Sequence, residues 1–535
     1  TVTHSVWNEP AYAGFFVFSH YTILYKKTTE KTILLDIMPI LSVFDNTSFN
    51  SIPVEDAKIE IVFPTSVFCV MLLDTKFTET TIMKTQTNTP NMETGSIPKL
   101  LAQLAIPAVV AQVINLLYNI VDRIYIGHIP GIGAAALTGV GLFTPILMLL
   151  NAFAMLVGSG GAPRAAIAMG KKDNDLAEKL LGNCFTLLVG LAVVLTIVFY
   201  VSAPTLLRLF GASDVTLTYA TDYARIYILG SFFVLIVLGM NTFITTQGFA
   251  KISMMTTIIG AVINIILDPI FIFALHMGVR GAALATIVSQ ALSCTWVLHF
   301  LMGKKSYLKI RRCNMKLKKD IILPSLALGL STFIMQSSES IISVCFNSSL
   351  LKYGGDLAVG AMTILTSAMQ FALLPLQGLG QGAQPIISYN YGAGQTKRVK
   401  DSFKLLLKID LSYSTFMWLL VMLFPAGFAS IFTSDQALLT FTAHALRIYM
   451  ASILLFGIQM ACQMTFTSIG NAKASIIVAV TRKFILLLPL IYIMPHIFTA
   501  DQTSAVYMAE PIADFLAICF TSILFRFEFK KALAR

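Results

Sequence analysis

Twelve long stretches of the sequence contain few or no charged residues, and each is long enough to cross a bilayer as a helix, which takes about 20 apolar residues. Helices are expected because lipid offers no partner to an unpaired backbone group. The 535 residues are 56% hydrophobic and 12% charged, about half of the charge usual in a soluble protein. The sequence therefore predicts an all-α integral membrane protein with twelve transmembrane helices. The stretches lie within 100–121, 129–163, 182–207, 226–250, 252–275, 281–303, 321–351, 357–385, 411–434, 448–472, 474–500 and 503–525.

Lys and Arg concentrate in alternate loops of this chain. They follow the second, sixth, eighth and twelfth spans, and the longest loop, 304–319, holds eight of them. Basic loops usually stay in the cytoplasm, so both termini of this multi-pass chain are predicted to be cytoplasmic. We expect the membrane to be the plasma (inner) membrane of a bacterium. The net charge of +11 is then explained by topology and does not indicate binding to nucleic acid.

The second half of the sequence repeats the first. GGAPRAAIAMG at 160–170 aligns with GAQPIISYNYG at 382–392, and TTQGFAK at 245–251 aligns with TSIGNAK at 467–473, both in the same register. Six spans per repeat is an even number, so the two halves have the same orientation and are predicted to form two pseudo-symmetric six-helix bundles. A cavity between two such bundles is typical of transporters.

Each half carries one acid in its first span. With a slightly shorter offset than that of the later segments, Pro107 aligns with Pro324 and Asp122 with Glu339. Charged residues inside membrane spans are costly and usually face a cavity or a partner. The alternatives are an interfacial ion pair of Asp122 with Arg123 and a structural role for Glu339.

The fifth span adds Asn264 and Asp268, which lie four positions apart and so share one helix face. Pro269 follows and is expected to free backbone carbonyls. Such hard oxygen ligands suit a small cation, and a desolvated carboxyl can carry a proton instead. The alternative is that Asp268 caps a half-helix beginning at Pro269. Asp514 in the last span is expected to be a packing or capping residue.

Residues 1–91 differ from the rest because they hold only one compact apolar run, 61–73, which is too short to span a bilayer. We expect 1–91 to be an N-terminal extension outside the transporter, 92–310 to form the first lobe with a cytoplasmic linker, and 311–535 to form the second lobe. The seven cysteines show no CxxC pairing, and neither a zinc motif nor a nucleophile elbow is present. The sequence thus predicts no enzyme and no cofactor.

Four further segments are characteristic: YNIVDRIYIG (118–127), NIILDP (264–269), GVRGAALATIVSQ (278–290) and QGAQPIISYNYGAG (381–394). Through them the chain from residue 92 onward resembles the MATE (multidrug and toxic compound extrusion) family, on its DinF-like branch with the MepA-type pumps. The resemblance implies a MATE fold that exports organic cations and drugs by alternating access, in antiport with H⁺ or Na⁺. It also implies a cation-coupling site at Asp122, Asn264, Asp268 and Thr286, which is the possible Na⁺ site.

In the second lobe the resemblance implies a substrate or ion site at Glu339, and a monomer is the expected state. A lipid-linked oligosaccharide flippase of the same superfamily is the alternative function. Flippases handle anionic pyrophosphate lipids, which call for basic residues in the cavity. Here the charged residues in the middle of the spans are mostly acids, and Arg482 and Lys483 are the exceptions.

Overall fold

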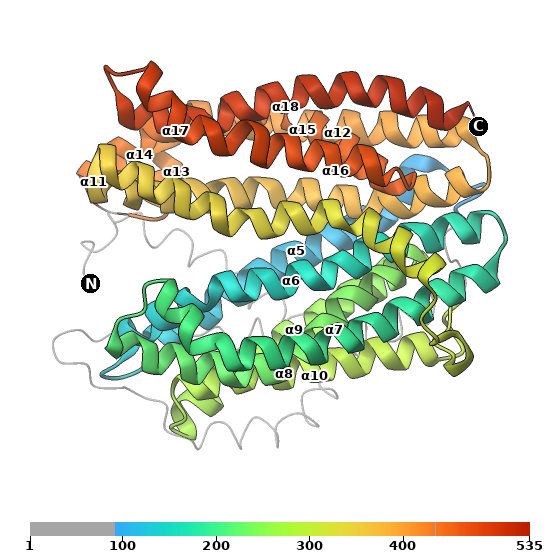
Figure 1. Ribbon diagram of the computed structural model, residues 1–535, viewed down its shortest axis with the longest axis horizontal. Coiled ribbons are helices and arrows are strands. Elements are labelled where there is room, and N and C mark those ends of the chain that lie inside the picture. The colour runs from blue at the N-terminus through green and yellow to red at the C-terminus, as the bar shows by residue number, and fades with distance from the viewer. Residues whose placement is uncertain (1–90, 434, 535) are drawn as a thin grey trace, which may run out of the picture. The chain divides into compact units, whose positions relative to one another are not determined.

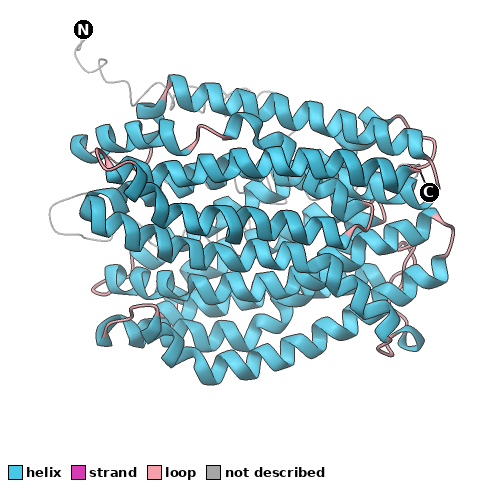
Figure 2. Cartoon of the chain, turned by 45° about the horizontal axis from the view of Figure 1, so that its top comes forward, coloured by secondary structure: helices cyan, strands magenta, loops and turns pink. Residues whose placement is uncertain are grey.

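The computed structural model describes residues 91–433 and 435–534, and helices account for nearly all of them (Figure 2). Within this part, ten helices are long and apolar enough to cross a bilayer, and a bent pair adds another. The predicted extension 1–91 lies outside the described residues except for Asn91.

The first half contains six spans separated by short turns. Local capping sets their ends: Ser213 and Thr216 form a capping box, and the Asp173 carboxylate accepts a hydrogen bond from the Leu176 backbone N–H. The fifth span ends in a π-helix, η2 (Ile270–Ala274), directly after Pro269. The spans are α5 (Ile97–Gly127), α6 (Gly133–Gly170), α7 (Asn174–Leu209), α8 (Asp214–Thr246), α9 (Ala250–Pro269) with η2, and α10 (Val279–Met302). A turn of 3₁₀-helix, η3 (Arg312–Asn314), lies in the loop that follows.

The second half contains the other six spans, and two of them form one continuous ribbon. Helix α11 (Lys319–Gly392) has 74 residues, about 110 Å at 1.5 Å per residue, which is far longer than one crossing needs. Gly355, with φ 64° and ψ −163°, divides it into two spans. The remaining elements are α12 (Thr396–Leu423), α13 (Pro425–Ser430), α14 (Gln436–Tyr449), α15 (Ile453–Ser468), α16 (Ala472–Val480), η4 (Thr481–Leu487), α17 (Leu488–Ile497) and α18 (Gln502–Leu533).

Helices α14 and α15 are bent by 49° and together make one span, and α16, the π-helix η4 and α17 make the next. With α11 counted twice, the described residues contain twelve spans. The prediction of an all-α membrane protein with twelve transmembrane helices is confirmed.

The internal repeat is visible in the helix boundaries. The same sequence register also aligns the helix starts. The first residue of α7 corresponds to the first residue of α12, and the starts of α8 and α9 correspond to those of α14 and α16. The turns repeat as well: Gly248 and Gly470 both adopt positive φ, at 92° and 74°. A residue with a Cβ is strained there, which explains why both copies of the motif carry glycine at this position.

The two halves share a packed core at one end of the bundle. This end, named the basic end here, carries the turns at 171–173, 303–318 and 393–395 and the C-terminal residues 526–534. One hydrophobic cluster joins Leu101 and Leu104 of α5 to Ile386 and Ile387 of α11. In Figure 1, α7 to α10 lie on one side, α12 to α18 lie on the other, and α5, α6 and α11 lie between them.

Small residues let the halves approach closely at the basic end. A Cβ built on Gly160 of α6 would meet the Ser325 carbonyl oxygen of α11 at 2.0 Å, and one on Gly382 of α11 would meet the Ala105 Cα of α5 at 2.4 Å. Gly160 and Gly382 are equivalent positions of the repeat, so the same contact is made twice about the pseudo-symmetry axis.

These contacts correct the alignment of the first spans. A Cβ on Gly378 would contact Val109, and the equivalent residue in the first half, Leu156, contacts Gly329. Val109 and Gly329 are therefore counterparts, whereas the alignment based on Pro107 and Pro324 would pair Val109 with Leu326. Glu339 thus lies about one helical turn from the true counterpart of Asp122, because the two prolines do not occupy equivalent positions.

Toward the opposite end, the two halves have separate cores. One cluster contains only residues between 126 and 287, and another contains only residues between 342 and 513. Aromatic contacts differ accordingly, with Phe143 packing on Tyr223 and Tyr227 in the first half and Phe346 packing on Tyr449 in the second. The halves are thus sealed together at the basic end and have separate buried hydrophobic clusters beyond it.

The first described residues dock onto the second half. Arg398 donates hydrogen bonds to the carbonyl oxygens of Met92 and Gly95, at 3.0 and 2.7 Å, and Asn390 donates to that of Met92 at 3.1 Å. The linker after α10 instead packs on the first half: the Lys318 backbone N–H donates to Asn183 Oδ1 of α7.

Candidate functional site

Three of the four residues proposed for the coupling site are joined by hydrogen bonds. Asn264 Nδ2 of α9 donates to Asp268 Oδ1, one turn later on the same helix, at 3.1 Å. It also approaches Thr286 Oγ1 of α10 at 3.4 Å, and the Thr286 hydroxyl donates to the Ala282 carbonyl oxygen. Asp122 of α5 is the fourth member and interacts electrostatically with Asp268. All four side chains are buried.

The cluster holds more acceptor oxygens than donors. Asp122 Oδ1, Asn264 Oδ1 and Asp268 Oδ2 are buried and have no hydrogen-bond partner. A buried polar atom without a partner costs roughly 1–3 kcal/mol, and a carboxylate costs more. Two acids and an amide with unpaired oxygens in one place favour a proton or a small cation among them.

The geometry favours neither alternative for the two acids, although Arg123 interacts electrostatically with Asp122. Among the described residues, no ion pair joins Asp122 to Arg123, and Arg123 is exposed while Asp122 is buried. Helix α9 continues through Asp268 and Pro269 into η2, whose N-cap is Pro269 without a side-chain cap. Asp268 therefore does not cap a separate half-helix.

Tyrosines surround the cluster and were missed by sequence reasoning. Tyr118 of α5 and Tyr223 of α8 both interact electrostatically with Asp122 and Asp268. Tyr223 and Tyr227 stack with ring centroids 5.9 Å apart. The signal in the sequence was the spacing of four positions between Tyr223 and Tyr227, which places both rings on one helix face.

Glu339 does not join this cluster. Its Oε1 lies 2.6 Å from Lys483 Nζ of η4, and half of its side-chain surface is exposed. The sequence showed no basic residue in the span of Glu339, but the partner comes from a different span, far along the chain. Asp514, expected to be structural, pairs with Arg482 at 2.6 Å.

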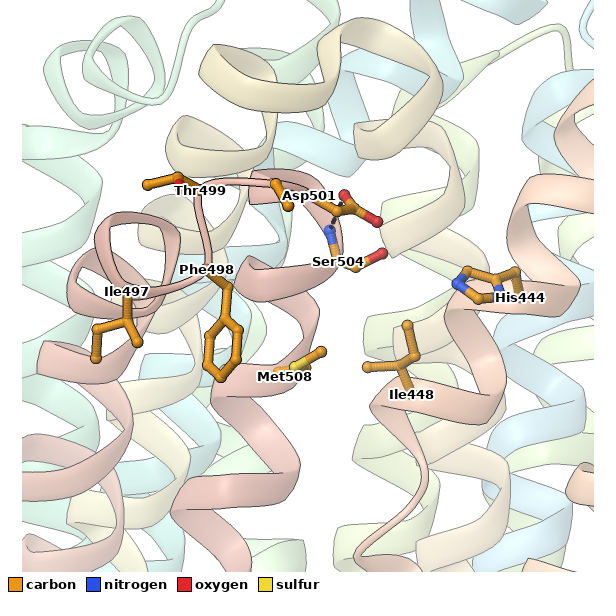
Figure 3. Close-up of a pocket in the computed structure, with 9 residues that line it drawn as sticks. His444, Ile448, Ile497, Phe498, Thr499, Asp501, Ser504 and Met508 are labelled. Carbon is orange, nitrogen blue, oxygen red and sulfur yellow. Dashed lines mark hydrogen bonds between the residues drawn. The ribbon is translucent and has the colours of Figure 1, made fainter.

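A cavity of about 510 Å³ lies elsewhere, beside the turn between α17 and α18 (Figure 3). Ile448, Phe498 and Met508 form its apolar wall, and His444 and Asp501 lie at its rim. None of the residues proposed for the coupling or substrate site lines it. Among the described residues, no group of three or more His, Cys, Asp and Glu side chains is placed to hold a metal ion.

The fold and these buried charges define a class of protein: a duplicated, twelve-span α-helical membrane protein of the transporter type. Comparison with known families identifies it further. The model of the MatE family matches residues 107–270 and 330–493, once in each half and together over more than half of the chain. The chain belongs to the MatE family of multidrug and toxic compound extrusion transporters.

Curated relatives agree with this assignment. The chain is 26% identical over 428 residues to the multidrug export protein MepA of Staphylococcus haemolyticus, covering 80% of this chain and 93% of the relative. It is also 26% identical over 412 residues to MepA of Staphylococcus aureus, covering 76% and 89%. Both relatives are named as export proteins.

Solved structures share the fold. A MOP superfamily transporter from Pyrococcus furiosus is 26% identical and superimposes with a TM-score of 0.77, covering 82% of this chain and 97% of the other. An outward-facing multidrug resistance MATE family transporter gives the same identity, TM-score and coverage. A MATE transporter in the bent conformation is 25% identical with a TM-score of 0.76, covering 82% and 98%.

Proposed function

We propose that the protein exports organic cations and drugs by alternating access, in antiport with H⁺ or Na⁺ bound at Asp122, Asn264, Asp268 and Thr286. The observation that carries the proposal is the set of three unpartnered oxygens, Asp122 Oδ1 of α5 and Asn264 Oδ1 and Asp268 Oδ2 of α9, all buried within membrane-spanning helices. The family membership and the MepA relatives support export of drugs.

The basic end is the cytoplasmic end in this proposal, because it holds the loops rich in Lys and Arg. The protein then resides in the plasma membrane of a bacterium, acts as a monomer and needs no cofactor. A bound ion and a bound drug must stabilise different states of one equilibrium for exchange to occur. Helix α5 supplies Asp122 and also packs on α11 at the basic end, so it links the coupling site to the seal between the halves.

Ethidium efflux from energised cells tests the proposal, with wild type beside Asp268→Asn and with and without Na⁺. Asp268→Asn should abolish efflux while the protein stays in the membrane. The control is Asp222→Asn, which removes an acid from an exposed pair with Arg280 in the same half. Efflux by Asp268→Asn at the wild-type rate would overturn the assignment of the coupling site.

A lipid flippase is the second candidate, and the charge of the second half argues against it. An anionic headgroup needs basic residues inside the spans, and Arg482 and Lys483 are residues of this kind. Both are buried and paired with Asp514, Glu510 and Glu339, which leaves this group of five with a formal net charge of −1. Cells that express the protein and grow without impairment, but export no cationic dye, would favour the flippase.

A further inference from the structure

Five charged side chains from three elements meet inside the second half. Arg482 and Lys483 are consecutive in η4, Glu510 and Asp514 are one turn apart on α18, and Glu339 lies on α11. The π-helical turn of η4 is wider than an α-helical turn, and both of its basic residues are buried. The described structure thus contains a charge cluster that matches no part of the first-half site.

Arg482 is held firmly within the cluster. Its Nε donates to Asp514 Oδ1 at 2.6 Å, an NH2 group lies 3.4 Å from Glu510 Oε1, and the guanidinium lies 4.6 Å from the centre of the Phe456 ring. Asp514 Oδ2 in turn accepts a hydrogen bond from Ser452. With its acids bound on both sides, Arg482 serves to fix α18 against η4.

Lys483 is bound differently, because its partner is accessible. Its side chain is 3% exposed, whereas that of Glu339 is 50% exposed. The carboxylate of Glu339 is therefore shared between a buried ammonium on one side and open space on the other. Glu510 also interacts electrostatically with Lys483, so the ammonium keeps an anionic neighbour when it leaves Glu339.

The face of α11 around Glu339 meets the first half. Ser340 Oγ lies 3.8 Å from Met148 Sδ of α6, and the ring of Phe333 lies 4.9 Å from that of Phe153. The open side of Glu339 is thus next to the boundary between the halves, where a transported molecule passes in an alternating-access protein. Aromatic rings and a polarizable thioether in this region suit an apolar cation.

We infer that Lys483 is an internal competitor for the substrate: the cationic group of an exported molecule displaces the Lys483 ammonium from Glu339, and release of the molecule restores the pair. The inference rests on the proposed function and adds a residue that sets affinity and release. With a formal charge of −1, the cluster becomes neutral on binding one monovalent cation. An anion in the same place would instead raise the net negative charge of the cluster to −2.

Ethidium binding to the full-length protein in lipid nanodiscs tests the inference. Lys483→Gln should lower the Kd by about tenfold or more, which corresponds to about 1.4 kcal/mol, because the ligand no longer competes with an ammonium. Lys483→Arg keeps the charge and should bind like wild type. Glu339→Gln should weaken binding by about tenfold, and Lys483→Gln should then have no further effect in that background.

The matched control is Lys473→Gln, which makes the same change at an exposed position of α16 in the same span. In transport assays Lys483→Gln should lower both KM and Vmax for ethidium, since a tightly held cation leaves slowly. A merely structural lysine would change the amount of folded protein and leave KM unaltered. The double variant Glu339→Gln/Lys483→Gln removes both charges. If Lys483→Gln alone does not assemble, ethidium binding by the double variant can still be compared with that by Glu339→Gln.

An unchanged Kd in Lys483→Gln, with ethidium bound by wild type, would overturn the inference and leave the proposed function standing. Absence of ethidium binding and efflux in wild type would overturn the proposed function and the inference with it. Tighter binding in Lys483→Gln that persists in the Glu339→Gln background would also overturn it, because the competition would not be for Glu339.

Discussion

The two halves share one backbone plan and have opposite buried chemistry. In the first half, α9 supplies an amide and an acid, and three oxygens of the cluster lack partners. In the second half, the equivalent span supplies Arg482 and Lys483, and acids from α11 and α18 pair with them. The two copies share a scaffold, but the buried acids of the first copy's site have no ion-pair partner among the described residues, whereas those of the second copy's cluster are paired with Arg482 and Lys483.

The comparison predicts different costs for removing a charge from each half. A buried ion pair that loses one partner is destabilised by roughly 3–5 kcal/mol, because the other charge stays buried and unpaired. An acid without a partner carries no such cost when it is neutralised. The buried pairs of Arg482 in the second half should therefore act as a stability element, and the unpartnered acids of the first half should act as an ion site.

The largest expected effect is in the second half. Arg482→Met should lower the free energy of unfolding by about 3–5 kcal/mol, because Asp514 and Glu510 lose their partner. Thermal unfolding of the detergent-purified protein measures it. Arg280→Met breaks the exposed pair with Asp222 and is the control, with little or no change in stability expected because solvent screens that pair.

Neutralising the two acids as well should recover most of the loss. The triple variant Arg482→Met/Glu510→Gln/Asp514→Asn leaves no buried charge at this position. If it is as unstable as Arg482→Met alone, the cost comes from lost packing on Phe456 and not from the unpaired acids.

The sequence was sufficient for the scaffold because lipid imposes simple rules. Long apolar stretches must be helices, and the spacing of Asn264 and Asp268 places them on one face of α9. Nothing in the spacing places Thr286 beside them; that expectation came from family resemblance. The structure supports the grouping through the contact of Asn264 with Thr286.

The second-half cluster could not be predicted in the same way. Glu339 and Lys483 lie in spans far apart along the chain, and hydrophobic stretches do not say which helices are neighbours. The π-helical turn also changes which residues of η4 face inward, so an ideal helix would give the wrong faces for Arg482 and Lys483. Packing register has the same limit, as the one-turn shift between Asp122 and Glu339 shows.

A moderate effect is expected at the first-half site. A ligand at a concentration of about 100 times its Kd stabilises the folded state by about 2.7 kcal/mol. The Tm of wild type should therefore rise with the coupling ion, measured in a NaCl series against choline chloride and in a separate pH series. Asp268→Asn should lose that rise and be no less stable than wild type without the ion.

The same series on a second-half variant sharpens the contrast. Glu339→Gln should keep the ion-dependent rise in Tm, because Glu339 does not contact the first-half cluster. If Glu339→Gln lost the ion-dependent rise in Tm and Asp268→Asn kept it, the ion site would have to be assigned to the second half and not to the first.

The smallest expected effect concerns Asp410 of α12, which is fully buried with neither carboxylate oxygen hydrogen-bonded. Its counterpart in the first copy of the repeat is Leu188 of α7, which is also fully buried and contacts the Gly239 position. Asp410→Leu should therefore stabilise the protein by about 1–3 kcal/mol, the cost of an unsatisfied buried polar group. Leu188→Asp is the reciprocal exchange and should destabilise the first half by at least as much. A drop in Tm or a loss of efflux in Asp410→Leu would instead show that the second half needs this carboxyl. The contrast between a half whose buried acids have basic partners and a half whose acids lack them would then no longer hold.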